Sequence, residues 1–159
     1  MKRHLLLVLA AALAACSPSQ QASAGNPAPV AHHSESGLEV IPLTVTGTDG
    51  KVHQFQVEVA ATDEEQAKGL MFRKRMGADE GMIFPRRPPD FASFWMRNTV
   101  IPLDIIFIGT DHRIINISAN AEPYSENPRA SLGLALGVLE LNGGRAEELG
   151  IGPGAKVEW

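Results

Sequence analysis

Between Leu38 and Trp159 the sequence is a series of short apolar runs separated by turn-forming residues. Runs of this kind, with alternating or β-branched apolar side chains bounded by Gly, Pro, Asn and Asp, are typical of β-strands. Only two short segments have helical character. We therefore expect a mostly β domain, either a β-sandwich or a partly open barrel with two short helices. An α+β roll, in which the first helix packs across one sheet, is the alternative.

The first elements of this domain have the clearest local signals. Leu38–Thr46 and Lys51–Ala60 flank the turn Gly47–Gly50, which predicts a β-hairpin. Thr62 is followed three residues later by Glu65. This spacing predicts a capping box, in which the two side chains satisfy free backbone donors at a helix start.

The later elements are expected to be short strands joined by turns. Arg86–Asp90 contains two prolines and is expected to be a turn, and Phe91–Asn98 is expected to be extended. Further strands are predicted at residues 81–85, 103–108, 113–119, 134–141 and 155–159, and a second short helix at residues 145–149.

The N-terminus has the features of an export signal. Met1–His4 is positively charged, and the apolar run Leu5–Ala12 is too short to cross a bilayer as a stable helix. The small residues Leu13–Ala15 lie directly before Cys16, and this quartet resembles the lipobox at which bacterial lipoproteins are lipidated and cut. We expect residues 1–15 to be removed and Cys16 to carry lipid. An ordinary signal peptide followed by a coincidental cysteine is the alternative.

Residues 16–37 are expected to be a lipidated cysteine and a disordered tether before a single β-rich domain, residues 38–159. The tether has few large apolar side chains, so burial cannot offset its ordering entropy. His32 and His33 lie in it and are expected to be solvated. Residue 17 is Ser rather than Asp, which by resemblance to Gram-negative lipoproteins points to the outer membrane. The expected location is therefore the cell envelope, at the periplasmic face of the outer membrane.

Charge and cysteine content exclude several functions. Without Lys2 and Arg3, 12 basic residues remain against 18 acidic ones, so the phosphates of nucleic acids are expected to be repelled. Membrane attachment then depends on lipid rather than on charge. Cys16 is the chain's one cysteine, so its lipidation leaves no thiol for disulfides, catalysis or metal binding. No cofactor is expected.

The segment Phe94–Asp104, with the sequence FWMRNTVIPLD, resembles the signature of the domain of unknown function family numbered one hundred and ninety-two. The resemblance covers the region from Val57 to Val157 and implies a compact β-rich fold, but no activity. Further motifs that support it are Gly69–Arg73, Gly81–Phe84, Val138–Leu141, Gly143, Gly144, Gly150, Ile151 and Gly154.

The same segment has the side-chain mixture of a binding site. On an extended strand Trp95 and Arg97 share one face, where an indole and a guanidinium can stack on and hydrogen-bond a ligand. The binding hypothesis is a shallow pocket for an anionic or carbohydrate-like group, with Asp104 orienting Arg97. Its candidate residues are Arg73, Trp95, Arg97, Asn98 and Asp104. The structural alternative places Trp95 in the core, pairs Arg97 with Asp104 and uses Asn98 to cap the turn.

Two other activities compete with binding. A hydrolase or lyase would use Asp104 or Glu140 as acid or base, although the sequence lacks a Gly-x-Ser-x-Gly elbow and a cysteine nucleophile, so no catalytic residue is assigned. A Cu(I) site would use the thioethers of Met71, Met82 and Met96, but core packing is the favoured role because none of them lies in a Met-x-Met or His-rich cluster. The sequence therefore favours an envelope lipoprotein whose domain binds a small ligand or a polypeptide partner.

Overall fold

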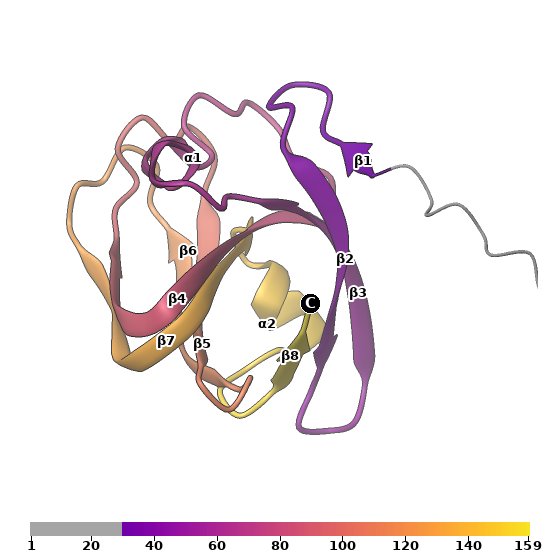
Figure 1. Cartoon of the computed structure of the whole chain (residues 1–159). Coiled ribbons are helices and arrows are strands. Elements are labelled where there is room, and N and C mark those ends of the chain that lie inside the picture. Colours follow the sequence, from indigo (N-terminus) through magenta and orange to yellow (C-terminus); the bar gives the residue numbers. More distant parts are fainter. Residues whose placement is uncertain (1–29) are drawn as a thin grey trace, which may run out of the picture.

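The structure of the chain is a computed structural model that describes residues 30–159, and β-strands form most of it. The expectation of a mostly β domain with two short helices is confirmed (Figure 1). The strands are β1 (Ala31–His32), β2 (Glu39–Thr46), β3 (Val52–Val59), β4 (Glu80–Phe94), β5 (Leu103–Gly109), β6 (Ile114–Ala121), β7 (Arg129–Asn142) and β8 (Lys156–Glu158), and the helices are α1 (Asp63–Lys68) and α2 (Arg145–Leu149).

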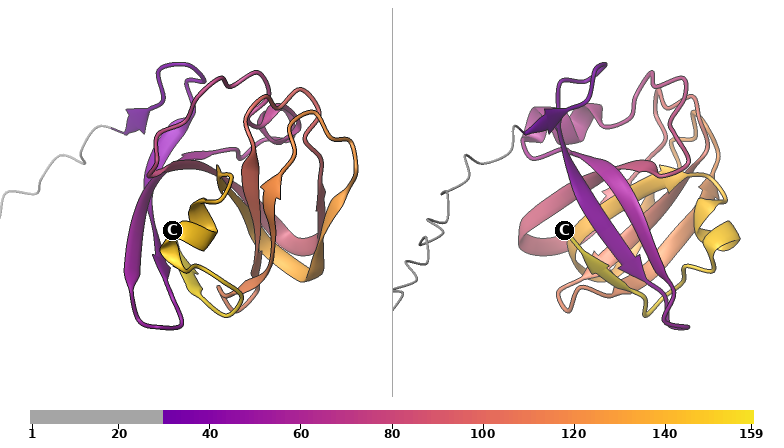
Figure 2. Two further views of the ribbon diagram at one scale, coloured as in Figure 1. Left: turned by 180° about the vertical axis from the view of Figure 1, so that it is seen from behind. Right: turned by 90° about the vertical axis from the view of Figure 1, so that its right-hand side faces the viewer.

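The strands form one strongly curved sheet in the order β1-β2-β3-β4-β7-β5-β6, with β8 also paired to β2. Neighbouring strands are antiparallel except β3 and β4, which are parallel. The curvature brings β6 toward β8, where an isolated bridge joins Arg113 to Lys156. The sheet is thus a partly open barrel (Figures 1 and 2).

Local sequence signals explain the first elements. β2 and β3 pair from Val40–Glu58 to Thr46–Val52, as the hairpin prediction requires. At the start of α1 the Thr62 hydroxyl accepts from the Glu65 backbone N–H at 3.3 Å. The Glu65 carboxylate accepts in return from the Thr62 N–H at 2.8 Å, so the capping box is confirmed.

The prediction of a turn at Arg86–Asp90 is wrong. β4 runs through this segment to Phe94 and stays beside β7, with a register shift between Pro85 and Asp90. Proline lacks the N–H that a strand ladder uses, so the prolines interrupt the pairing and bend the strand without ending it. The strand does end at Phe94, and Arg97 and Asn98 form a turn.

The described fold begins before Leu38. Ala31 and His32 pair with Val40 and Glu39 of β2, so this part of the expected tether belongs to the sheet. Cys16 and the expected signal peptide lie outside the described residues. Within residues 30–159, neither helix is long and apolar enough to span a bilayer.

Two groups of buried apolar side chains pack on opposite faces of β4, β5 and β7. Along β7 the side chains alternate between them, since Leu139 and Leu141 belong to the first core and Val138 to the second. The second core lies on the face of the sheet that also carries the candidate site, and its members are Ala60, Leu70, Met82, Phe84, Ala92, Met96, Leu103, Ile105, Phe107, Ala121, Ala135 and Val138.

Candidate functional site

A pocket of about 310 Å³ opens beside the second core, and we call it the Glu140 pocket. Its walls come from α1 and the loop after it, from β4, from the turn that follows β4 and from β7. The lining residues are Gln66, Ala67, Lys68, Gly69, Leu70, Met71, Phe84, Arg86, Ser93, Phe94, Trp95, Arg97, Thr99 and Glu140.

Glu140 is the one carboxyl group in this lining, and it is 4% exposed. On β7 it lies between Met82 of β4 and Ile105 of β5, both fully buried. Its side chain points to the same face of β7 as the side chain of Val138, which belongs to the second core. No hydrogen bond to this carboxyl is present among the described residues.

Burial raises the pKa of Glu140 to about 8, because the apolar surroundings disfavour the charged form. At neutral pH the group is therefore mostly a neutral carboxylic acid, which has one O–H to donate. A buried acid of this kind in a pocket can donate a hydrogen bond to a ligand or transfer a proton.

Trp95 and Arg97 lie together at the rim of the pocket, but they follow the end of β4 and do not share one face of an extended strand, contrary to the expectation. The Arg97 guanidinium carbon is 3.9 Å from the centre of the Trp95 ring, and Trp95 is 47% exposed. On its other side Arg97 donates two hydrogen bonds of 3.1 Å to the carboxylate of Glu126. The rim thus presents an indole stacked on a cation whose partner is solvent-exposed.

Arg86 adds a second cation to the lining. Its guanidinium lies 5.8 Å from the centre of the Phe94 ring. Within residues 30–159 it forms no ion pair, and its Nε is buried without a hydrogen-bond acceptor. Arg86 can therefore bind a negatively charged ligand group, whereas Arg97 is already paired with Glu126.

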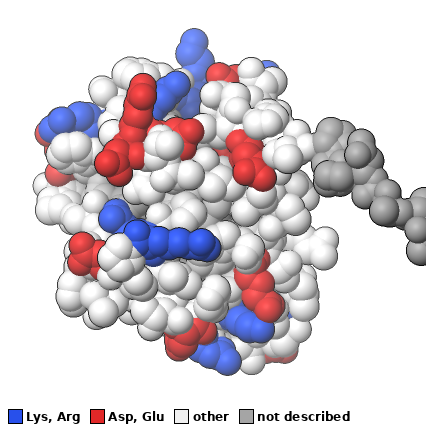
Figure 3. Space-filling view, in the orientation of Figure 1, with Lys and Arg blue, Asp and Glu red and all other residues white. Residues whose placement is uncertain are grey.

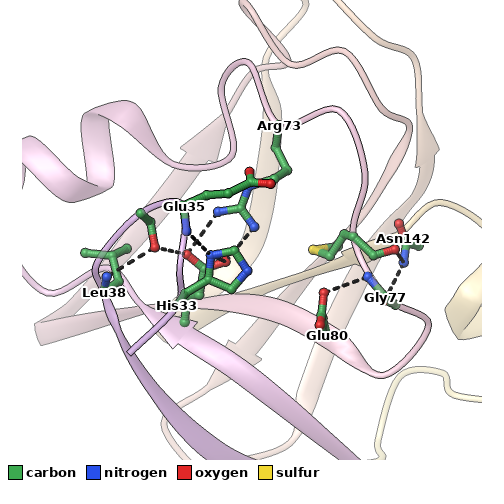
Figure 4. Close-up of polar contacts among 10 residues, drawn as sticks. His33, Glu35, Leu38, Arg73, Gly77, Glu80 and Asn142 are labelled. Atoms are coloured by element: carbon green, nitrogen blue, oxygen red, sulfur yellow. Dashed lines mark hydrogen bonds and ion pairs between the residues drawn. The ribbon is translucent and has the colours of Figure 1, made fainter. Parts of the chain in front are cut away.

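Arg73 is not part of the Glu140 pocket. Its guanidinium donates to both carboxylate oxygens of Glu58 at 2.7 and 3.0 Å, and its Nε lies 3.2 Å from a Glu35 oxygen (Figure 4). These hydrogen bonds raise the pKa of Arg73. Ser36 also donates to Glu58, so the N-terminal segment covers this ion pair. Arg73 is thereby occupied within the protein and forms a wall of a neighbouring pocket of about 540 Å³.

The expectation that Asp104 orients Arg97, and its alternative of an ion pair between them, are both wrong. Asp104 is fully buried, and its Oδ1 accepts from the backbone N–H groups of Asn120 and Gly144 at 2.7 and 2.9 Å. Its Oδ2 accepts from the N–H of Ala146 at 2.8 Å. Asp104 thus joins β5 to β6 and to the start of α2, and it has no role at the pocket.

Asn98 supports the turn behind the rim. Its φ of 56° lies in the left-handed region, which Asn tolerates, and its carbonyl accepts from the Phe72 N–H at 2.8 Å. Its Nδ2 lies 3.7 Å from the sulfur of Met71. Asn98 therefore positions the pocket wall and does not line the pocket itself.

The three methionines are divided between core and pocket. Met82 and Met96 are fully buried in the second core, whereas Met71 lines the Glu140 pocket. Among residues 30–159 no group of three His, Cys, Asp or Glu side chains could hold a metal ion. The Cu(I) hypothesis, whose ligands would be thioethers, stays a prediction.

Charged side chains of both signs share the face drawn in Figure 3, with a band of Lys and Arg across its middle and acidic side chains above it. The Glu140 pocket is locally more positive than this mixture. Lys68, Arg86 and Arg97 line it together with a single carboxyl, which burial keeps mostly neutral.

The sequence indicated Trp95 and Arg97 as candidate binding residues, but it did not indicate that Glu140 lies in the same pocket. The available signal was a charged residue inside the apolar run from Val138 to Leu141. A carboxyl at a position where strand periodicity requires a buried side chain is a functional-site signal, since buried acids without a partner are rare.

Comparisons with known proteins identify an uncharacterised family and similar solved structures. A family model described as DUF192, Uncharacterized ACR, matches residues 44–159. The crystal structure of a protein of unknown function from Novosphingobium aromaticivorans DSM 12444 is 62% identical with a TM-score of 0.80, over 84% of this chain and 94% of that chain. A proposed transcription regulator from Sinorhizobium meliloti 1021 is 36% identical with a TM-score of 0.74, over 76% of this chain and 94% of that chain. No curated protein matches.

Proposed function

Because the chain belongs to the DUF192 family, whose description assigns no activity, we propose a function from geometry: the domain binds a small organic ligand in the Glu140 pocket. The observation that carries this proposal is the Glu140 carboxyl, which is 4% exposed and receives no hydrogen bond from the described residues. The carboxyl lines the pocket, and its oxygens are not among the fully enclosed side-chain atoms that lack a partner, so they are accessible from the pocket. A largely buried polar group whose partner is at best solvent in a narrow pocket contributes less to stability than one with a fixed partner. A ligand that hydrogen-bonds this group would supply that partner.

The rest of the lining supports the proposal. Phe84, Phe94 and Leu70 supply apolar walls, and Trp95 with Arg97 supplies a stacking surface and charge at the rim. Small-molecule sites combine apolar walls with placed polar groups, and in this pocket polar and apolar surface contribute equally. The volume of about 310 Å³ lies at the small end of the usual range.

The proposal is tested by screening a fragment library against the full chain by thermal shift. We expect compounds that bind the pocket to raise the Tm of the parent, and Trp95→Ala to weaken that effect. Trp159→Phe is the matched control, because Trp159 is the other tryptophan and does not line this pocket. Compounds that shift the parent and the Trp95→Ala variant equally would contradict the proposed site.

A polypeptide partner is the second candidate for binding. Phe72 and Tyr124 are 66% and 63% exposed, and both hold left-handed backbone conformations, with φ of 64° and 60°. Such conformations are unfavourable for bulky residues and concentrate at functional sites. Their loops join the site through hydrogen bonds from the Phe72 N–H to Asn98 and from the Tyr124 N–H to Thr99. Loss of partner capture on Phe72→Ser but not on Phe91→Ser, an equally exposed phenylalanine on β4, would support it.

Acid–base catalysis is a further candidate, and it now depends on Glu140 instead of Asp104. A carboxyl with a pKa of about 8 is suited to transfer a proton near neutral pH. A turnover that Glu140→Gln abolishes while ligand binding persists would support catalysis. Equal loss of binding and turnover would not.

We also propose that lipid on Cys16 anchors the protein in the cell envelope, at the periplasmic face of the outer membrane. The support is the sequence Leu13–Ala15 directly before Cys16, preceded by a charged and then an apolar segment. This location would expose the pocket to small molecules of the envelope.

A further inference from the structure

We propose that the ligand of the Glu140 pocket is an organic anion with an apolar body, whose anionic group binds at Arg86 and whose far end carries a neutral hydrogen-bond acceptor for Glu140. This inference rests on the proposed function and adds the chemical class of the ligand. Three observations carry it: the charges of the lining, the surroundings of Glu140 and the apolar wall between the two polar groups.

The charges of the lining favour an anion. Lys68, Arg86 and Arg97 all line the pocket, so a cationic ligand would be repelled by each of them. Arg97 already holds Glu126. Arg86 forms no ion pair within the described part of the chain, and its Nε is buried without an acceptor. Lys68 is also unpaired among residues 30–159, but it is exposed, whereas Arg86 is partly buried. An anionic group on the ligand therefore has Arg86 as its available partner inside the pocket.

The surroundings of Glu140 determine the other end of the ligand. Met82 and Ile105 flank the carboxyl on the adjacent strands, and no described residue donates to it. In this environment the group is a neutral acid that donates its O–H. A carbonyl or ether oxygen on the ligand can accept that hydrogen bond. A second carboxylate would face an apolar cluster, and an ammonium would first require Glu140 to ionise.

On β4 Phe84 lies between Met82, the pairing partner of Glu140, and Arg86, so an apolar ring separates the two polar groups along this strand. The rings of Phe84 and Phe94 meet edge to face with centroids 5.0 Å apart, and Leu70 completes this wall. A flat aromatic or alicyclic body packs well against such rings. The compound 4-acetylbenzoate has the three required parts, namely a carboxylate, an aromatic ring and a ketone at the opposite end, and it is the first probe.

Two analogues separate the contributions of the two ends. The compound 4-isopropylbenzoate has nearly the same shape but no acceptor, and 4-acetylbenzylamine keeps the ketone but carries a cation. At pH 6 we expect calorimetry of the full chain to show that 4-acetylbenzoate binds about tenfold more tightly than either analogue, the effect of one hydrogen bond to a buried group or of one ion pair.

Variants of the two polar groups give the residue-level test. Glu140→Gln keeps a hydrogen-bond donor and is expected to retain the preference for the ketone, whereas Glu140→Met, of similar size, should remove it. Arg86→Met should weaken both benzoates by about tenfold. Arg87→Met is the matched control, because Arg87 is exposed on the same strand and does not line the pocket. Circular dichroism confirms that each variant is folded.

The outcomes separate the ligand class from the proposed function. Preference for the amine, or equal binding of the two benzoates to parent and Glu140→Met, would overturn the class while leaving ligand binding in place. Binding of library fragments in the pocket without binding of 4-acetylbenzoate would also overturn the class alone. If neither the probes nor any fragment binds in the pocket, the proposed function itself fails.

Discussion

The guanidinium of Arg97 lies over the indole ring of Trp95, with its central carbon 3.9 Å from the ring centre. These residues are two apart in the sequence and come directly after β4 ends at Phe94. The contact fixes the orientation of the ring at the rim of the Glu140 pocket. Because both side chains are partly exposed, it is expected to matter more for the shape of the rim than for the stability of the fold.

Arg97→Ala should therefore change the free energy of unfolding by less than about 1 kcal/mol but make Trp95 more accessible to solvent. Acrylamide quenching in a Trp159→Phe background reports on Trp95 alone, since the chain has two tryptophans. Glu126→Gln, which removes only the ion pair, is the control. Unchanged quenching in Arg97→Ala would show that the stacking does not hold in solution.

Asp104→Asn should destabilise the protein by about 2–3 kcal/mol, because hydrogen bonds to a charged acceptor contribute strongly and a buried donor is left unsatisfied. The amide group cannot accept from both sides of Asp104, whose two oxygens bind the N–H groups of Asn120, Gly144 and Ala146. Urea unfolding measures the change. Stability equal to that of the parent would mean that these backbone groups have other partners.

Arg73→Ala should cost about 3–5 kcal/mol, since it leaves the buried Glu58 carboxylate without its cation. The double variant Arg73→Ala with Glu58→Ala should lose less than the sum of the single variants. Glu35→Gln, which alters the exposed partner of Arg73, should change stability by less than about 1 kcal/mol. Additive costs in a double-mutant cycle would contradict an energetic coupling between Arg73 and Glu58.

The Glu140 carboxyl gives stability a specific pH dependence. Its pKa is raised from 4.5 to about 8, so between these values the folded state binds more protons than the unfolded state. The contribution of Glu140 to the free energy of unfolding is therefore full below pH 4.5 and is lost as the pH rises toward 8.

Glu140→Gln should accordingly be more stable than the parent at pH 8, by on the order of 1.4 kcal/mol for each unit of pKa shift, and close to it at pH 4. Urea unfolding of both proteins across this range measures the difference. Asp79→Asn, which alters an exposed carboxylate, is the control. Parallel stability curves for the parent and Glu140→Gln would show that Glu140 titrates normally.

If Cys16 is the acylated residue, the Cys16→Ala variant should carry no lipid and should not lose its signal peptide by lipoprotein processing. Mass spectrometry of the parent from a membrane fraction is expected to find an acylated N-terminal peptide that begins at Cys16. An unmodified N-terminus, or membrane association unchanged in Cys16→Ala, would contradict the anchor.

Features that depend on near neighbours in the sequence were predicted correctly. The hairpin of β2 and β3, the capping box of Thr62 and Glu65, and the shared position of Trp95 and Arg97 each need information from only a few consecutive residues. The turn predicted at Arg86–Asp90 was wrong because of its two prolines. A missing proline N–H is typical of a turn, but it is also compatible with a strand whose pairing is interrupted.

Features that depend on distant pairing were not predicted. Asp104 binds backbone groups 16 to 42 residues away, and only the folded sheet brings them together. Glu140 reaches the pocket through the register of β7 with β4 and β5, which turns its side chain to the second core. A one-residue change in that register would turn Glu140 to the other face, so sequence periodicity alone does not place it.

The most direct test of the account is a map of NMR chemical-shift changes in the full chain on addition of the fragments that raise its Tm. The account predicts that the changes concentrate at Trp95, Arg97 and Glu140 and at the loop from Gly69 to Met71, and that Glu140→Met reduces them. Changes concentrated elsewhere, such as around Trp159, or the absence of any fragment that perturbs Glu140, would contradict it.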